Sequence, residues 1–132
     1  MTEPAVTRAR QLKSDIGAIA MQPGSLPVET GWAELIVVTL AAHEVRDGAK
    51  REQFFRDLRR VVSPQGQVVV VEHLRDVIAA LAFGPGIFHF YPRGEWLRLG
   101  KLVGLQVKRE LPITPFIQVF AYCPETGHCK SS

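Results

Sequence analysis

Two apolar runs that flank a helix-like segment constrain the fold of this chain most strongly. Residues 35–42 and 68–71 do not alternate polar with apolar side chains. That pattern is typical of strands buried on both faces, as in parallel sheets covered by helices. Between the runs, apolar side chains recur at helical spacing, at Phe54, Phe55, Leu58, Val61 and Val62. The order strand, helix, strand predicts a right-handed βαβ unit.

Turn signals and a change of period predict the remaining elements. Asp47 is a candidate N-cap for the helix between the two runs, and the proline and glycine in residues 63–66 predict a turn that ends it. Residues 95–103 predict a second helix, with Gly104 just beyond its end. Alternation over residues 105–111, followed by a turn and an apolar run, predicts a C-terminal hairpin.

These elements predict an α/β fold with a mainly parallel sheet, a C-terminal antiparallel hairpin and helices on both faces. The chain has 132 residues, which fits one domain. We expect a partly irregular N-terminal segment over residues 1–25, the α/β domain over residues 26–124, and a disordered tail over residues 125–132.

Composition narrows the range of partners and locations. Hydrophobic residues make up 46% of the chain and charged residues 22%, which is ordinary for a globular protein. The net charge is +3 without a long basic run, so no nucleic-acid partner is expected. No apolar stretch approaches the roughly 20 residues that span a bilayer, and no signal peptide is recognisable. A cytoplasmic location is therefore predicted.

The two cysteines lie close together near the C-terminus. Cys123, His128 and Cys129 have the spacing C-x4-H-C, which matches no common zinc pattern and lacks a fourth ligand. We therefore predict no metal site and expect incidental thiols in a frayed tail.

Each buried strand ends in an acid–histidine pair, His43-Glu44 and Glu72-His73. Ligands of open parallel sheets bind outside the carboxyl ends of the strands, and histidine titrates near neutral pH. His43 and His73 are therefore candidate catalytic bases. The alternative is that both histidines only bond loop backbone at the strand ends. Glu44 or Glu72 is a candidate to orient a histidine, although neighbours within a strand point to opposite faces.

An aromatic segment follows the second acid–histidine pair. Residues 83–92 hold four aromatic side chains and His89 between glycines and prolines. Such a segment predicts a flap over a pocket or a hydrophobic plug. His89, Phe88 and Tyr91 are candidate contacts for an aromatic or lipid-like acceptor, and core filling is the alternative for them.

The ordered series of segments from residue 26 onward resembles the C-terminal two-thirds of class I S-adenosylmethionine-dependent methyltransferases. The matching pieces begin with Leu26-Pro27 and include Ala-His-Glu-Val at residues 42–45 and Val-Val-Val-Glu-His at residues 69–73. Residues 58–66 are the most recognisable piece, similar to L-R-R-V-L-x-P-G-G. The resemblance implies a partial Rossmann-like sheet and methyl transfer from S-adenosylmethionine to a small molecule. It also implies cofactor contacts at Gln22, Ala42 and His43.

The sequence departs from that family on the cofactor side. No G-x-G precedes residue 26, and Gln22 stands where the family carries an acid. Two hypotheses stay open: a truncated or divergent methyltransferase, or a non-catalytic domain that acts through self-association or partner binding. In the family, the strand that matches residues 35–40 pairs with a strand that has no counterpart here. We therefore expect residues 16–21 to fold beside that edge, or two chains to associate there as a homodimer.

Overall fold

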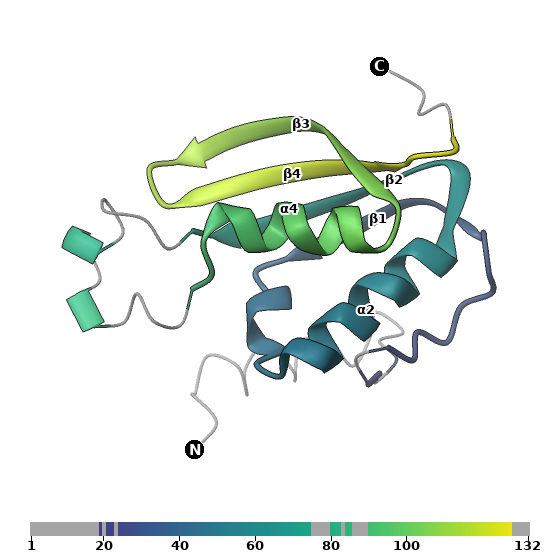
Figure 1. Ribbon diagram of the computed structural model, residues 1–132, viewed down its shortest axis with the longest axis horizontal. Helices are drawn as coiled ribbons and strands as arrows, with labels where there is room; N and C mark the ends of the chain where they lie inside the picture. Colours follow the sequence, from purple (N-terminus) through teal and green to yellow (C-terminus); the bar gives the residue numbers. More distant parts are fainter. Residues whose placement is uncertain are drawn as a thin grey trace.

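The computed structural model describes residues 19, 21–22, 24–74, 80–82, 84–85 and 90–127. Figure 1 shows their arrangement, a sheet with helices in front of it. The elements, in chain order, are β1 (Ala33–Thr39), the 3-10 helix η2 (Ala42–Glu44), α2 (Gly48–Val61), β2 (Val62–His73), α4 (Arg93–Leu102), β3 (Leu105–Thr114) and β4 (Ile117–Pro124).

The four strands form one mixed sheet in the order β1-β2-β4-β3. β1 and β2 are parallel and are joined through α2, which confirms the predicted βαβ unit. β4 pairs antiparallel with both β2 and β3, which confirms the C-terminal hairpin. The prediction of a mainly parallel sheet is wrong: among the described strands only β1 and β2 pair in parallel, and the C-terminal hairpin places β4 antiparallel beside β2.

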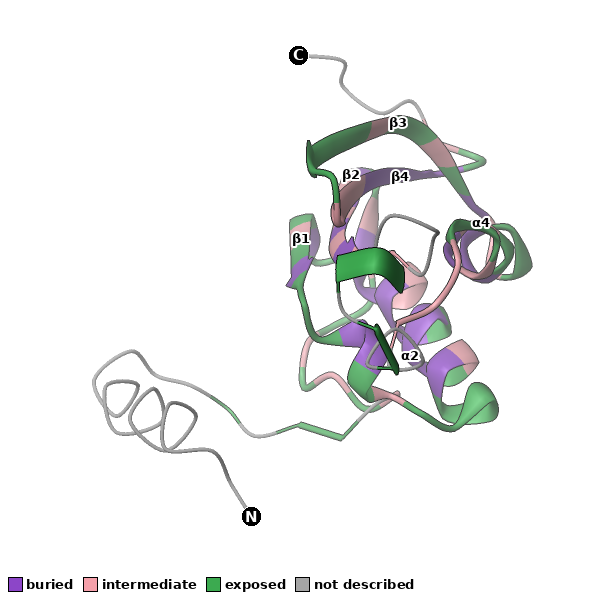
Figure 2. Cartoon of the chain, turned by 90° about the vertical axis from the view of Figure 1, so that its left-hand side faces the viewer, coloured by how far each residue is buried: buried purple, intermediate pink, exposed green. Residues whose placement is uncertain are grey.

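The core lies between the sheet and the two helices, which pack on the same face. β2 and β4 point alternate residues into this core, and α2 and α4 cover them; the main contributors are Phe54, Phe55, Leu58, Val68, Val70, Trp96, Leu99, Phe120 and Tyr122. Figure 2 shows both helices on one side of the sheet, with buried residues on the central strands and on the helices that pack against them. Helices on both faces were expected, but within the described ranges the second face carries none.

Local signals placed most helix limits correctly. Asp47 caps α2, because its carboxylate accepts hydrogen bonds from the main-chain N–H groups of Ala49 (2.8 Å) and Lys50 (3.2 Å). Gly104 follows α4 with a φ of 76°, which glycine adopts without strain. Residues 63–66 were expected to form a turn. They belong instead to the extended start of β2, where the register with β1 shifts.

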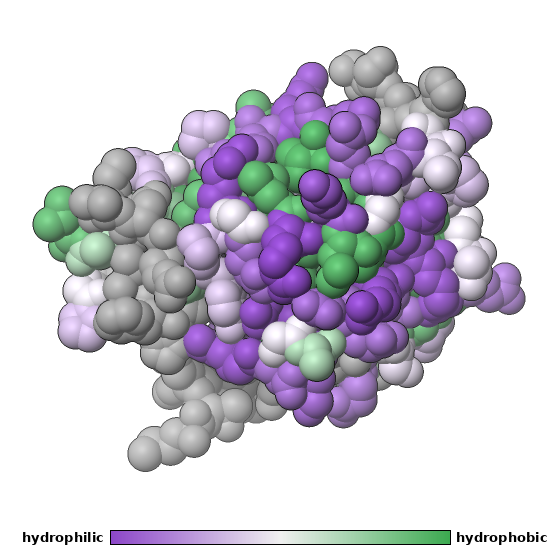
Figure 3. Space-filling view, viewed as in Figure 1, coloured by the Kyte–Doolittle hydropathy of each residue, from purple (hydrophilic) through white to green (hydrophobic). Residues whose placement is uncertain are grey.

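The helix-bearing face is mainly hydrophilic, with small apolar patches between charged side chains, as Figure 3 shows. No helix within the described residues has both the length and the apolar character needed to cross a membrane. Cys123 is fully buried near the end of β4 and is disulfide-bonded, so it is not the incidental tail thiol that was expected. His128 and Cys129 lie outside the described residues.

Candidate active site at the strand ends

The carboxyl ends of β1 and β2 meet around the side chain of Glu72. After β1 the chain turns at Leu40, whose φ of 48° is uncommon for a leucine, and enters η2. Glu72 lies near the end of β2 and is 0% exposed beneath this turn. Its Oε1 accepts hydrogen bonds from the N–H groups of Ala42 (2.7 Å) and His43 (3.4 Å). Its Oε2 lies 2.6 Å from His43 Nδ1.

The pairing joins the two strand ends rather than neighbours in sequence. Glu72 points to the helix-covered face of β2, the same face as Val68 and Val70, so its carboxylate reaches under η2. Glu44 also contacts His43, with 3.0 Å between Oε1 and Nε2. Strand alternation argued against a contact between these neighbours, but residues 42–44 form a 3-10 helix, where that rule does not apply.

The two carboxylates control the protonation of His43. The hydrogen bond that His43 Nδ1 donates to Glu72 raises the pKa of His43 above its ordinary value of 6.5, and the charges of Glu72 and Glu44 act in the same direction. Burial of the imidazole opposes them and lowers the pKa. With a carboxylate oxygen at each ring nitrogen, the geometry is that of an imidazolium that donates from both. Because the side chain of Glu44 is 71% exposed, its oxygen can be replaced by an incoming ligand.

The remaining predicted site residues lie around an aromatic cluster or outside the described ranges. His73 stacks on the ring of Phe90, with 4.7 Å between ring centroids, and the same ring meets His43 edge-on at 6.0 Å. Tyr91 is half-buried and packs edge-on against Trp96. His89 and Phe88 lie outside the described residues. The structure therefore brings the two candidate bases to the same aromatic ring.

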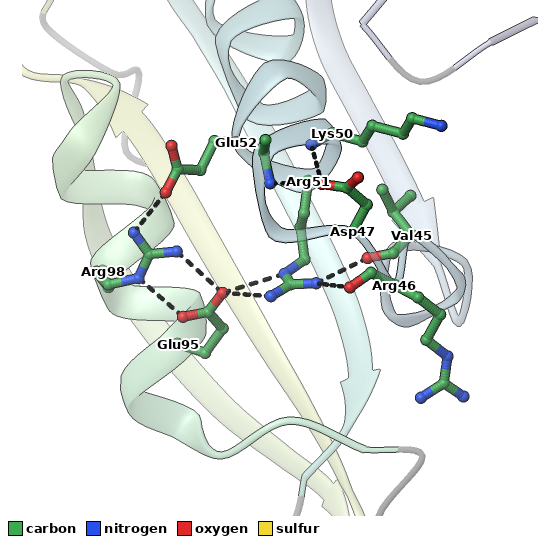
Figure 4. A network of polar contacts seen from close by, with 9 residues as sticks. Val45, Arg46, Asp47, Lys50, Arg51, Glu52, Glu95 and Arg98 are labelled. Atoms are coloured by element: carbon green, nitrogen blue, oxygen red, sulfur yellow. Dashed lines mark hydrogen bonds and ion pairs between the residues drawn. The ribbon is translucent and has the colours of Figure 1, made fainter.

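A buried arginine holds the loop that follows η2. The side chain of Arg51 donates to the carbonyl oxygens of Val45 (2.7 Å) and Arg46 (3.3 Å) and to Glu95 Oε1 (2.8 Å from Nη2). Its guanidinium also lies over the ring of Tyr91, 4.1 Å from the centroid. Figure 4 shows how Arg51 joins this loop to α4, where Glu95 also binds Arg98. The hydrogen bonds of Arg51 therefore hold the loop next to His43 in place.

The position of Arg51 in the sequence indicates that it is buried, although a pattern of apolar residues alone does not include it. Arg51 precedes Phe55 by four residues and Leu58 by seven, so it lies on the buried stripe of α2. A charged residue on such a stripe predicts a buried partner, here Glu95 from the next helix. Asp57 is a second example, because it is buried and binds the main-chain N–H of Leu26 and the side chain of Arg60.

Replacement of Arg51 by methionine is expected to destabilise the fold by roughly 2–3 kcal/mol, because it leaves the carbonyl oxygens of Val45 and Arg46 without this donor and leaves Glu95 with Arg98 as its remaining partner. Arg98→Ala is the matched control, since the side chain of Arg98 is 47% exposed and binds the same Glu95. Its expected cost is at most about 1 kcal/mol. Urea unfolding of both variants measures the difference. Equal losses would contradict a central role for Arg51.

A cleft of about 1020 Å³ opens beside β1 and the start of α2. Its polar lining residues are Gln22, Thr39, Glu44, Arg46, Asp47 and Lys50. Gln22, which the resemblance implies as a cofactor contact, is one of these lining residues, and its contact with a cofactor stays a prediction. Ala42 and His43 are not among the lining residues, but Glu44, which contacts His43, is one of them.

The described residues do not complete a site for S-adenosylmethionine. Cofactor sites of Rossmann-like folds use glycines where the main chain approaches the ligand and an acid for the ribose hydroxyls. No described residue that lines this cleft is a glycine. Of its two acids, Asp47 is committed to capping α2. The cleft therefore supplies one wall of such a site, with Gln22, Thr39 and Glu44 as its polar groups.

Comparison with solved structures identifies the architecture. A SAM dependent methyltransferase from Aquifex aeolicus superposes with a TM-score of 0.70 at 16% identity, over 92% of this chain and 64% of that one. Mitomycin 7-O-methyltransferase MmcR gives a TM-score of 0.71 at 17% identity, over 92% of this chain and 40% of that one. The chain has the class I methyltransferase fold.

The methyltransferase fold does not by itself decide the reaction. A protein described as a pericyclic reaction enzyme matches with a TM-score of 0.68 at 13% identity, over 93% of this chain and 35% of that one. One fold thus serves more than one chemistry. The chain spans less than two-thirds of the length of these three neighbours. No protein-family model matches the sequence, and no curated protein matches it significantly.

Proposed function

We propose that this chain acts in S-adenosylmethionine-dependent methyl transfer to a small-molecule acceptor and supplies the base on the acceptor side. One observation carries the proposal: a methyltransferase-like sheet holds an imidazole between a buried and an exposed carboxylate at its strand ends. In this reaction the cofactor provides the methyl group. The residues of this chain orient the acceptor and receive its proton.

The geometry of His43 suits proton transfer at Nε2. The hydrogen bond between Nδ1 and Glu72 fixes the ring and keeps that nitrogen protonated, so Nε2 is the atom that exchanges a proton. An acceptor hydroxyl that displaces Glu44 from Nε2 donates its proton to the neutral imidazole. The resulting imidazolium is stabilised by Glu72. His73 and Tyr91 are proposed to contact the acceptor through the aromatic cluster around Phe90.

Calorimetry with S-adenosylmethionine tests the proposal. Because the described cleft supplies one wall only, we expect weak binding, with a dissociation constant of roughly 0.1–1 mM. Gln22→Ala is expected to weaken it several-fold, since Gln22 lines the cleft. Lys101→Ala, on the exposed end of α4, is the control and is expected to bind as the wild type does. The absence of binding heat at millimolar cofactor would contradict an enzymatic role for this chain.

A second function is favoured by a separate observation. β1 carries exposed apolar side chains at Leu35 and Val37, and β2 is its only strand neighbour among the described residues. We propose as the alternative a non-catalytic domain of methyltransferase-like fold that acts by self-association. A chain that associates but binds no cofactor would support this alternative over the enzyme.

A further inference from the structure

The two outer strands of the sheet differ in how they resist pairing with another chain. Edge strands of stable monomers carry lysine, proline or bulges that prevent such pairing. β3 has these features: Lys108, Arg109 and Pro112 lie in it, and its register shifts twice. β1 has none of them from Leu35 to Thr39, a run of five uncharged residues. Within the described residues, β3 thus carries these protective features and residues 35–39 of β1 do not.

The main chain of β1 leaves alternate hydrogen-bonding groups facing away from β2. The N–H of Leu40 donates to the carbonyl oxygen of Val71 on β2 (2.8 Å). Because these groups alternate in direction along a strand, those of Leu35, Val37 and Thr39 point to the opposite side. The side chains of Leu35 and Val37 are 58% and 57% exposed on the sheet face away from the helices. The edge therefore presents main-chain hydrogen-bonding groups that point away from β2, together with exposed apolar side chains.

We propose that this edge is a docking surface for a second copy of the chain, with the two β1 strands paired antiparallel around a two-fold axis at Ile36. In this register Leu35 lies opposite Val37 of the second copy, and the two residues exchange main-chain hydrogen bonds. Symmetry doubles the pair, which gives about four such bonds. The exposed apolar side chains of both copies then form one stripe.

The sequence of β1 is compatible with pairing to itself. Its one charged residue, Glu34, lies opposite Val38 of the second copy, so the two glutamates are not juxtaposed. Each β1 also keeps its parallel partner β2, so the two sheets become one continuous sheet. Val37 and Thr39 also line the cleft, so the second β1 lies next to residues of the cleft wall.

Sedimentation equilibrium of the full chain, from micromolar to near-millimolar concentration, tests the proposal without any ligand. A single pair of edge strands buries a small interface, so we expect a dissociation constant of roughly 1–100 µM and a species of twice the monomer mass of 14.7 kDa. A wild type that stays monomeric throughout this range overturns the proposal.

Two variants separate this edge from the rest of the surface. Leu35→Lys introduces a charge on the exposed side of β1 and is expected to weaken association at least tenfold. Leu111→Lys is the matched control on β3, where the side chain is 49% exposed, and is expected to leave association unchanged. Both positions are exposed, so both variants should fold. The reverse result, with only Leu111→Lys weakening association, would place the interface elsewhere.

A cysteine at the two-fold axis tests the register. Directly opposed residues in a non-hydrogen-bonded antiparallel pair have Cα atoms about 4.5 Å apart, within disulfide range. Ile36→Cys is therefore expected to give a covalent dimer on oxidation, which reductant removes. The wild type, oxidised in parallel, shows any contribution from Cys123 and Cys129. A dimer by sedimentation without cross-linking at Ile36→Cys would refute this register.

Discussion

Replacement of Glu72 by alanine is expected to destabilise the fold by about 3–5 kcal/mol. The carboxylate is fully buried and satisfies three donors: the N–H groups of Ala42 and His43 and the imidazole Nδ1. Its removal leaves these donors buried and leaves a cavity beneath η2. Urea unfolding followed by circular dichroism measures the loss. A loss below about 1 kcal/mol would show that the pair does not hold the turn.

Two further variants separate charge from burial in this effect. Glu72→Gln keeps the shape and one acceptor oxygen, so its expected loss is smaller, about 1–3 kcal/mol. Glu44→Ala removes the other carboxylate at His43, but that side chain is mostly exposed, so the expected change is within about 0.5 kcal/mol. Similar losses for Glu72→Ala and Glu44→Ala would contradict the assigned difference in burial.

Replacement of His43 by alanine is expected to lower kcat/KM for methyl transfer by about 10²–10⁴-fold, the usual contribution of a general base. The measurement uses labelled cofactor and the best acceptor from a panel of aromatic and lipid-like hydroxyl compounds. The wild-type rate is expected to rise with pH through the raised pKa of His43, because only the neutral imidazole accepts a proton. This rise should be absent in His43→Ala.

The control for His43 is Lys101→Ala, whose side chain is exposed at the end of α4. Its expected rate and pH profile equal those of the wild type. If His43→Ala keeps full activity with an unchanged pH profile, His43 is not the base. The candidate His73 then takes its place, tested in the same way.

Local sequence patterns predicted the elements of this fold better than their arrangement. The helical stripe through Phe55 and Leu58 and the cap at Asp47 depend on neighbours along the chain, and the structure confirms them. The predicted strand over residues 105–111 is also present, but its alternation ends at Val107, where the register with β4 shifts and leaves Leu111 exposed. The order of strands depends on contacts between distant segments. The sequence of β4 does not by itself indicate that this strand pairs with β2 as well as with β3.

The location of the candidate site was predictable from the sequence, but the hydrogen bonds and ion pairs within it were not. Buried runs that end in acid–histidine pairs placed His43 and Glu72 at one sheet edge, because parallel strands end together. The hydrogen bond between His43 and Glu72 depends on the 3-10 helix at residues 42–44. The apolar run gave no signal for that helix, because it was interpreted as a strand up to residue 42. Arg51 was missed because the hydrophobic pattern counts apolar residues alone, although Arg51 lies on the buried stripe of α2. Glu95 was missed because it looks like a solvated helix residue until its partner is known.

The raised pKa of His43 also makes the stability of the fold depend on pH. His43 gains a carboxylate partner on folding, so its folded-state pKa lies above its unfolded value. The stabilisation is therefore fully present below about pH 6.5 and is lost as the pH rises through the raised pKa. The free energy of unfolding of the wild type should fall over that window, and the fall should be smaller in Glu72→Gln. An equal fall in the free energy of unfolding in the wild type and in Glu72→Gln would contradict the link between the pKa of His43 and stability.

Proton NMR of the histidine Cε1–H resonances tests the pair of Glu72 and His43 most directly. The chain has four histidines, so each resonance can be assigned by single substitution. We expect the midpoint of His43 to lie above the ordinary value of 6.5 in the wild type and to fall in Glu72→Gln. A His43 midpoint at the ordinary value, unchanged by Glu72→Gln, would contradict the base proposed for this site.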